Sequence, residues 1–298
     1  MTNAKRSLIS MVIVLIVTVL GLAFSWFAGT GGAQWNGYPV LYLCALVAFA
    51  VNWLAYIPSA LARTEKYYDF VGSLTYLAVI TTAVILSGPL EIKAIIAAVM
   101  VAIWCIRLGS FLFIRIQQSG HDSRFDQIKV NPARFLVAWS LQALWAIFTA
   151  AAALAIITAA DRGTLDLFFW IGTLVWAGGF AIETIADRQK HAFRKNPGNT
   201  GRFIQSGLWA WSQHPNYFGE IMLWTGITII ALPLLSGWGW LVLLSPIFVT
   251  LLLTKVSGIP LLDKSAKNRW GDDPAYQEYR RKTPILVPRP PRQPSHRA

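Results

Sequence analysis

Long runs of apolar residues alternate with short polar stretches along the whole chain. A helix needs about 20 apolar residues to cross the hydrocarbon core of a bilayer. Eight runs meet or approach this length, at residues 8–28, 39–62, 70–86, 91–114, 134–160, 165–186, 217–235 and 238–259. The pattern predicts an all-α fold, a polytopic integral membrane bundle of about eight transmembrane helices. The first run lacks a small-residue cleavage site, so we expect it to remain as an anchor.

Proline and glycine interrupt the last two runs. Only Ser236 and Gly237 separate them, which predicts a helical hairpin. The final run contains Pro246 and ends at Gly258 and Pro260, so we expect a kink or a break there.

The overall composition agrees with a membrane protein. Of the 298 residues 55% are hydrophobic and 13% are charged, with a mean hydropathy of +0.49, whereas soluble domains carry about 25% charged residues. These values exclude a disordered chain and argue against a soluble domain.

The sequence contains no motif typical of a disulfide framework, a metal site or a nucleotide-binding loop. Cys44 and Cys105 lie in apolar runs and form no CxxC pair, so no disulfide framework is expected. The histidines form no HxxxH or HxxH cluster, which argues against a di-iron or zinc site. We therefore expect no metal. Neither a GxGxxG nor a P-loop pattern occurs.

The net charge of +12 follows from topology. With the N-terminus in the cytoplasm, all lysines and arginines except Lys93, Arg107 and Arg162 fall on the cytoplasmic side. We therefore expect both termini in the cytoplasm, an inner (plasma) membrane location, and no nucleic-acid partner. Residues 1–283 are expected to form one membrane domain, and the proline-rich basic segment 284–298 a flexible tail.

Some charged residues remain unexplained by topology. Charged groups inside a membrane helix are costly unless paired or hydrated, so they indicate function. Arg107 and Arg115 are eight residues apart and share a helix face. Glu183 and Asp187 are four apart, and their repulsion requires a nearby arginine or a ligand.

A second polar group surrounds the start of the seventh run. Pro215 suits the first turn of a helix, whose free N–H groups attract anions. Asn216 and Glu220 share one face of that helix, and His214 and Tyr217 flank it. Arg194 and Arg202 precede it in a turn-rich loop.

Further along, Tyr276, Tyr279 and Thr283 share one face of a short amphipathic helix. Arginines suit phosphates, carboxylates suit ribose hydroxyls, and aromatic rings suit a base. We expect these positions to form one cytoplasmic cavity for a large anionic ligand, and a phosphorylated dinucleotide fits.

Four segments resemble a known family: GLWAWSQHPNYFGEIMLWTGI, IETIADRQKHAFR, YQEYRRKTPILVP and WCIRLGSFLFIR. Together they are similar to the bacterial DUF1295 group of the steroid 5-alpha-reductase superfamily, which also includes isoprenylcysteine carboxyl methyltransferases. The resemblance implies a membrane-embedded, NADPH-dependent reductase of a carbon–carbon double bond conjugated to a ketone, acting on a lipid-like substrate of steroid or isoprenoid type.

The resemblance also implies residue roles. The residues implied for cofactor binding are Arg107, Arg115, Glu183, Asp187, Arg194, Arg202, His214, Asn216, Tyr217, Glu220, Tyr276 and Tyr279. Glu183 stands where the animal steroid reductases have asparagine. Asn216 and Glu220 match the pair beside the nicotinamide, which gives Glu220 a catalytic role as well.

The chain departs from the animal enzymes at the substrate ketone. Trp104 replaces a tyrosine one turn before Arg107, and Tyr56 stands near the place of a glutamate that precedes a proline. We therefore assign Tyr56, Trp104 and Glu220 as catalytic, with Tyr56 donating to the ketone oxygen. Tyr68 and Tyr76 are rival donors.

Two other functions remain open. One is an S-adenosylmethionine-dependent methyltransferase of a lipid or prenylcysteine, which HPNY favours but the surplus of arginines does not, because that cofactor carries no phosphate. The other is a non-catalytic lipid-binding or transport protein, although no inverted repeat is visible. We see no sign of an obligate protein partner.

Overall fold

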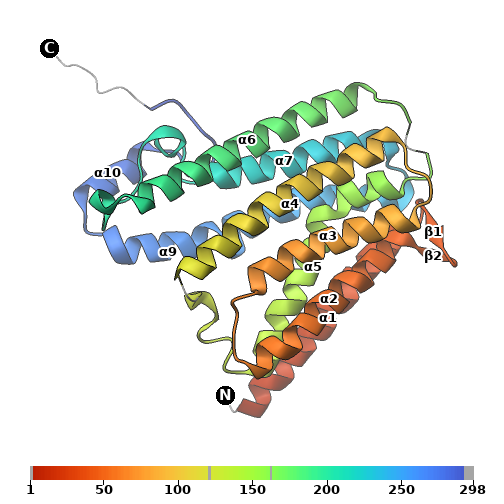
Figure 1. Ribbon diagram of the computed structural model, residues 1–298, viewed down its shortest axis with the longest axis horizontal. Helices are drawn as coiled ribbons and strands as arrows, with labels where there is room; N and C mark the ends of the chain where they lie inside the picture. Colours follow the sequence, from red (N-terminus) through yellow and green to blue (C-terminus); the bar gives the residue numbers. More distant parts are fainter. Residues whose placement is uncertain (1–2, 120–121, 162, 292–298) are drawn as a thin grey trace. The chain divides into compact units, whose positions relative to one another are not determined.

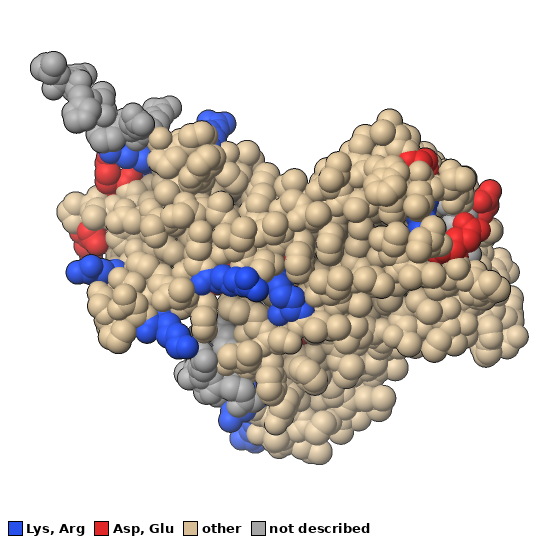
Figure 2. All heavy atoms as spheres, turned by 45° about the horizontal axis from the view of Figure 1, so that its top comes forward, with Lys and Arg blue, Asp and Glu red and all other residues tan. Residues whose placement is uncertain are grey.

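The computed structural model describes residues 3–119, 122–161 and 163–291. Eight of its helical segments are long and apolar enough to cross a membrane, which confirms the predicted all-α membrane fold. The face in Figure 2 is largely free of charged side chains, as expected of a surface in contact with lipid. The side of the membrane on which each terminus lies stays a prediction.

The elements follow the apolar runs closely. Ten α-helices are described: α1 Asn3–Gly29, α2 Val40–Leu61, α3 Tyr68–Leu86, α4 Ile92–Ser119, α5 Pro132–Thr158, α6 Leu167–Lys195, α7 Pro215–Ala231, α8 Leu244–Leu251, α9 Ile259–Trp270 and α10 Pro274–Lys282. The strands β1 Gln34–Trp35 and β2 Tyr38–Pro39 form a tight antiparallel hairpin. At its tip Asn36 and Gly37 both have positive φ, as a two-residue turn requires.

The chain divides into two compact units. The first contains the residues up to Phe169 together with Ile230–Ser245, and the second contains Trp170–Ile229 together with the chain from Pro246 onward. The expectation that residues 1–283 form one domain stays a prediction.

Helix α5 forms the centre of the first unit. It packs against α1, α2, α3 and α4 (Figure 1). In its apolar 18-residue stretch, 78% of the residues are buried. Its alanines at 150–153 are fully buried, and such small side chains let neighbouring helices approach closely.

A buried ion pair lies at one end of the first unit. Lys93 in the first turn of α4 is 1% exposed, and its Nζ lies 3.1 Å from Oδ2 of Asp166. Oδ1 of Asp166 accepts a hydrogen bond from the N–H of Phe169 and caps α6. Lys93 is one of the three basic residues that the sequence does not place on the cytoplasmic side, and its side chain is buried in this ion pair.

In the second unit α6 and α7 pack very closely. A Cβ at Gly219 of α7 would lie 2.6 Å from the Glu183 nitrogen and from the Gly179 oxygen of α6. Helix α6 extends to Lys195, nine residues beyond the predicted end of its apolar run. The extension occurs because a helix leaving the bilayer keeps its hydrogen bonds while its side chains become polar.

The last run is broken, as predicted. A five-residue π-helical stretch, Leu252–Val256, follows α8, and Gly258 then directly precedes α9. π-Helical turns of this kind are rare and often occur at functional sites. Helix α9 itself was not predicted, whereas α10 confirms the predicted amphipathic helix.

The segment 284–298, expected to be a flexible tail, begins with residues that form hydrogen bonds to the second unit. Ser212 and Gln213 donate to the carbonyl oxygens of Leu286 and Pro284, both at 2.8 Å. The N–H of Arg289 donates to the Trp211 oxygen at 3.0 Å. Residues 284–289, the C-terminal strap, are therefore attached to the second unit, because prolines lack an N–H but still offer carbonyl acceptors. Residues 292–298 lie outside the described part.

Candidate functional site

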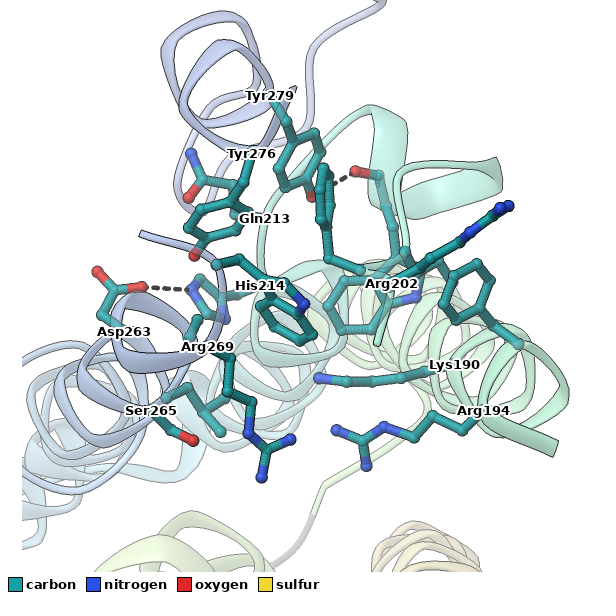
Figure 3. A pocket seen from close by; sticks show the side chains of 17 residues that line it. Lys190, Arg194, Arg202, Gln213, His214, Asp263, Ser265, Arg269, Tyr276 and Tyr279 are labelled. Atoms are coloured by element: carbon teal, nitrogen blue, oxygen red, sulfur yellow. Dashed lines mark hydrogen bonds and ion pairs between the residues drawn. The ribbon is translucent and has the colours of Figure 1, made fainter. Parts of the chain in front are cut away.

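A cavity of about 130 Å³ lies within the second unit. Its walls come from the end of α6, the loop before α7, α9 and α10 (Figure 3). The side chains that line it include Lys190, Arg194, Arg202, His214, Asp263 and Arg269. Four cations and one carboxylate line this pocket, which suits an anion.

Side-chain hydrogen bonds hold the loop on α6. Nε1 of Trp209 donates to the Ala186 oxygen at 3.0 Å, and the N–H of Leu208 donates to Oε1 of Gln189 at 2.9 Å. Trp209 is 3% exposed. The loop that carries Arg202 is thus fixed at its far end by a buried indole.

Gln213 connects the pocket to α10. Its Nε2 donates to the carbonyl oxygens of Thr283 at 2.6 Å and Arg280 at 3.2 Å, so it caps the end of that helix. Tyr279 on α10 donates from its hydroxyl to the Trp209 oxygen at 2.7 Å. The loop and α10 therefore form one hydrogen-bonded wall.

Aromatic rings form the other side of the pocket. The ring of Phe203 lies 5.1 Å from that of Tyr276 and 5.5 Å from that of Tyr279. Trp270 contacts both Phe203 and Tyr276, at 6.0 and 5.8 Å. Such faces can stack on a flat heterocycle.

The carboxylate of the pocket is already engaged. Asp263 accepts a hydrogen bond from Nη2 of Arg280 at 2.9 Å, and Nε2 of His214 lies 3.7 Å away. Burial, reinforced by the charge of Lys190, lowers the pKa of His214 to about 4. His214 is therefore neutral at physiological pH, and the positive charge comes from the lysine and arginines.

The structure brings together some of the predicted cofactor residues and separates others. Lining the pocket are Arg194, Arg202, His214, Tyr276 and Tyr279. The ring of Tyr217 stacks on His214 at 5.6 Å.

Another group lies between α6 and α7. Nδ2 of Asn216 donates to Oδ1 of Asp187 at 3.2 Å, which joins the two helices. Glu183 is 2% exposed and Asp187 is 8% exposed. Glu220 is half-buried one turn after Asn216. These four residues belong to the same unit as the pocket but are not among its lining residues.

The remaining predicted residues lie in the first unit. Trp104 is buried with its ring edge-on to Tyr76 at 5.1 Å, three residues before Arg107. The hydroxyl of Tyr56 donates to the Pro132 oxygen at 3.2 Å. Since they belong to the other unit, none of them lines the pocket described above. The side chain of Arg115 lies outside the described part.

The rival donors lie in two different environments. The hydroxyl of Tyr68 donates to the Ala138 oxygen at 2.9 Å, and its ring lies among Phe125 and Trp139. Tyr76 is 8% exposed beside Trp104.

Sequence reasoning missed several lining residues. Lys190 lies one helical turn before Arg194, so the spacing could have revealed it. Asp263, Arg269 and Trp270 lie on α9, where the spacing of three to four residues between Asp263, Ala266 and Trp270 is helical. The run was interpreted as ending at residue 259, which hid this signal.

Among the described residues no group of three or more His, Cys, Asp or Glu could hold a metal ion.

The comparisons with known proteins cover different parts of the chain. Residues 55–283 match the family described as "Protein of unknown function (DUF1295)". A segment of 71 residues is 39% identical to 3-oxo-5-alpha-steroid 4-dehydrogenase 1 of Macaca fascicularis, and the same holds for the Homo sapiens protein. That segment is 24% of this chain and 27% of the relative.

A plant relative and the solved structures complete the comparison. A segment of 63 residues is 33% identical to Delta(14)-sterol reductase of Arabidopsis thaliana, covering 18% of this chain and 17% of that protein. The matches thus span about a quarter or less of the curated relatives. No solved structure matches the chain. Because the family match covers most of the sequence, this chain belongs to the DUF1295 family, which is related to the steroid 5-alpha-reductase superfamily.

Proposed function

We propose that the protein is a membrane-embedded, NADPH-dependent reductase of a carbon–carbon double bond conjugated to a ketone in a lipid-like substrate. The observation that carries this proposal is the pocket, where four cations face a wall of aromatic rings. The names of the steroid and sterol relatives support the same class of reaction.

The residues of the pocket fit the phosphorylated end of NADPH. Arg194 and Arg202 would bind phosphates, and Phe203 and the tyrosines of α10 would accept the base. The cavity is smaller than the ligand pockets of about 300–1,000 Å³ found in most proteins. It would therefore hold one end of the cofactor, while Asn216 and Glu220 would orient the nicotinamide.

The chemistry divides between the cofactor and this chain. NADPH, when bound, supplies a hydride to the β-carbon, and the α-carbon takes a proton. Negative charge develops on the ketone oxygen, and a positioned hydrogen-bond donor stabilises it. We assign that donor to Tyr56, whose hydroxyl would exchange the Pro132 carbonyl for the substrate. Tyr68 and Tyr76 are the rival donors.

The placement in the membrane is part of the proposal. The positive-inside pattern favours an inner (plasma) membrane protein with its active site facing the cytoplasm. Charged NADPH would enter from the aqueous side and the lipid-like substrate from the bilayer.

A methyltransferase using S-adenosylmethionine is the competing enzyme. The same rings would accept its adenosine, but it has no phosphate for the four cations of the pocket. A lipid-binding protein without a cofactor is the remaining alternative.

Thermal melting of the purified protein with NADPH, NADH and S-adenosylmethionine separates these functions. A ligand at about 100 times its dissociation constant adds about 2.7 kcal/mol of stability. Stabilisation by the nicotinamide cofactor supports the reductase. Selective stabilisation by S-adenosylmethionine, or no shift with any of the three, contradicts it.

Two variants locate the binding site. Arg202→Ala and Asn216→Ala are expected to lose the NADPH shift while the ligand-free protein stays folded in detergent. Arg281→Ala is the matched control, because that arginine is exposed and pairs with Glu278 on α10. Wild-type NADPH affinity in both test variants would disprove the assigned site.

A further inference from the structure

We infer that helix α9 and the turn before it lie at the membrane surface and bind the headgroups of anionic phospholipids through Lys255, Lys264 and Lys267. The inference concerns the face of α9 that does not line the pocket. It therefore does not depend on the proposed reductase activity.

The last apolar segment is too long to lie wholly inside a bilayer. Residues Gly237–Trp270 form a stretch of 34 residues, which would be about 50 Å long as one continuous helix. The hydrocarbon core of a bilayer is only about 30 Å thick. The regular helix is interrupted before Gly258, and charged residues begin to recur in α9 directly after this glycine. Helix α9 is therefore the part of the segment that leaves the hydrocarbon core.

The two sides of α9 serve different surroundings. Asp263, Ala266 and Arg269 line the pocket, whereas Lys264 and Lys267 do not. Residues three apart on a helix are neighbours on its surface, so these two lysines lie side by side. They form a second polar surface on the same helix, separate from the cavity.

Exposed apolar side chains accompany the lysines. Val256, directly after Lys255, is 65% exposed, and Leu261, one helical turn before Lys264, is 44% exposed. Apolar side chains beside lysines are typical of a helix at a membrane surface. The aliphatic groups enter the acyl region there, while the long lysine side chains reach the headgroups.

The lysines of this surface have no protein carboxylate to balance them. All three are exposed, and among the described residues none has a carboxylate within ion-pair distance. The basic residues of α10 differ, because Glu278 lies 2.7 Å from both Arg281 and Lys282. An anionic headgroup complements the unpaired charge of the α9 surface. A phosphatidylcholine headgroup does so less well, because it carries its own cation beside the phosphate.

The test measures which lipids gather beside α9 in the full-length protein. Asn268→Cys places a thiol at an exposed position of α9, and the native Cys44 and Cys105 are at most 1% exposed, so a fluorophore labels the new thiol selectively. The protein is reconstituted in nanodiscs with phosphatidylglycerol or phosphatidylcholine that carries a nitroxide quencher near the headgroup. The ratio of the two quenching curves gives the local enrichment of the anionic lipid.

We expect phosphatidylglycerol to be enriched at least about tenfold, because each lysine close to an anionic surface adds a preference of about fivefold. Lys264→Gln/Lys267→Gln should remove most of this enrichment, and Lys264→Arg/Lys267→Arg should retain it. Arg281→Gln/Lys282→Gln is the matched control, because it also removes two positive charges from the same unit, but from a helix where both are paired. Its enrichment should change less than about twofold.

Three results would overturn the inference. Equal quenching by the two lipids in the protein with all its lysines would show that α9 does not select anionic headgroups. An equal loss in the α9 and α10 double variants would show that only the net charge matters. Weak quenching by both lipids would show that α9 lies away from the membrane surface. The reductase proposal survives all three, because melting with the cofactors tests it separately.

Discussion

The buried ion pair between Lys93 and Asp166 predicts an asymmetric response to mutation. Lys93 is 1% exposed, whereas Asp166 is 32% exposed and also accepts the Phe169 N–H. Asp166→Asn leaves an ammonium group in the interior without its carboxylate. Breaking a buried pair in this way costs about 3–5 kcal/mol.

Removing the lysine instead should cost much less. In Lys93→Met the remaining carboxylate keeps its backbone hydrogen bond and reaches water, so the loss should stay near that of a surface pair, about 1 kcal/mol or less. The double variant Lys93→Met/Asp166→Asn should then be more stable than Asp166→Asn alone, because it no longer contains a buried ammonium group without a carboxylate.

A fluorogenic dye that reacts with thiols can report unfolding through the protein's own cysteines. Cys44 and Cys105 are free and at most 1% exposed, so they react when the first unit opens. With about 2–4 °C per kcal/mol, a loss of about 3–5 kcal/mol should lower the melting temperature of Asp166→Asn by about 6–20 °C relative to the wild type. Asp161→Asn, at an exposed position in the same connection, is the control. Equal losses in the two single variants, or a larger loss in Lys93→Met, would refute the argument.

Two further predictions concern the loops and the C-terminal strap. Burial raises the pKa of Glu65, but hydrogen bonds from Lys129 and the Asp122 N–H outweigh this and hold the pKa below its ordinary value. Glu65 therefore stabilises the fold above about pH 4.5, and this contribution is lost as the pH falls through the lowered folded-state pKa. Glu65→Gln should melt lower at neutral pH and converge with the wild type in acid; a constant gap across a pH series would contradict this. Truncation after Thr283 removes four hydrogen bonds between the strap and residues 211–213, and a typical hydrogen bond contributes about 1 kcal/mol. It should lower both the melting temperature and the NADPH affinity, whereas truncation after Pro291 should change neither; identical behaviour of the two truncations would show that the strap is dispensable.

Part of the candidate pocket could be predicted from local sequence. Arg194, Arg202 and His214 cluster around one turn-rich loop, and Tyr276 and Tyr279 share a helix face, so short-range spacing was enough. Lys190 and Arg269 were missed for a different reason. The predicted topology already accounts for many basic residues, and only the tertiary structure shows that these two line the same cavity.

The sequence by itself determined the eight spans, their breaks and the family. Hydrophobic length and proline positions act locally, since each helix must satisfy its own backbone hydrogen bonds in lipid. The tertiary structure decided what the polar residues do. It buried Lys93 against Asp166, placed Asn216 against Asp187, and attached the strap through backbone hydrogen bonds. These outcomes depend on contacts between residues far apart in the chain, which no local pattern specifies.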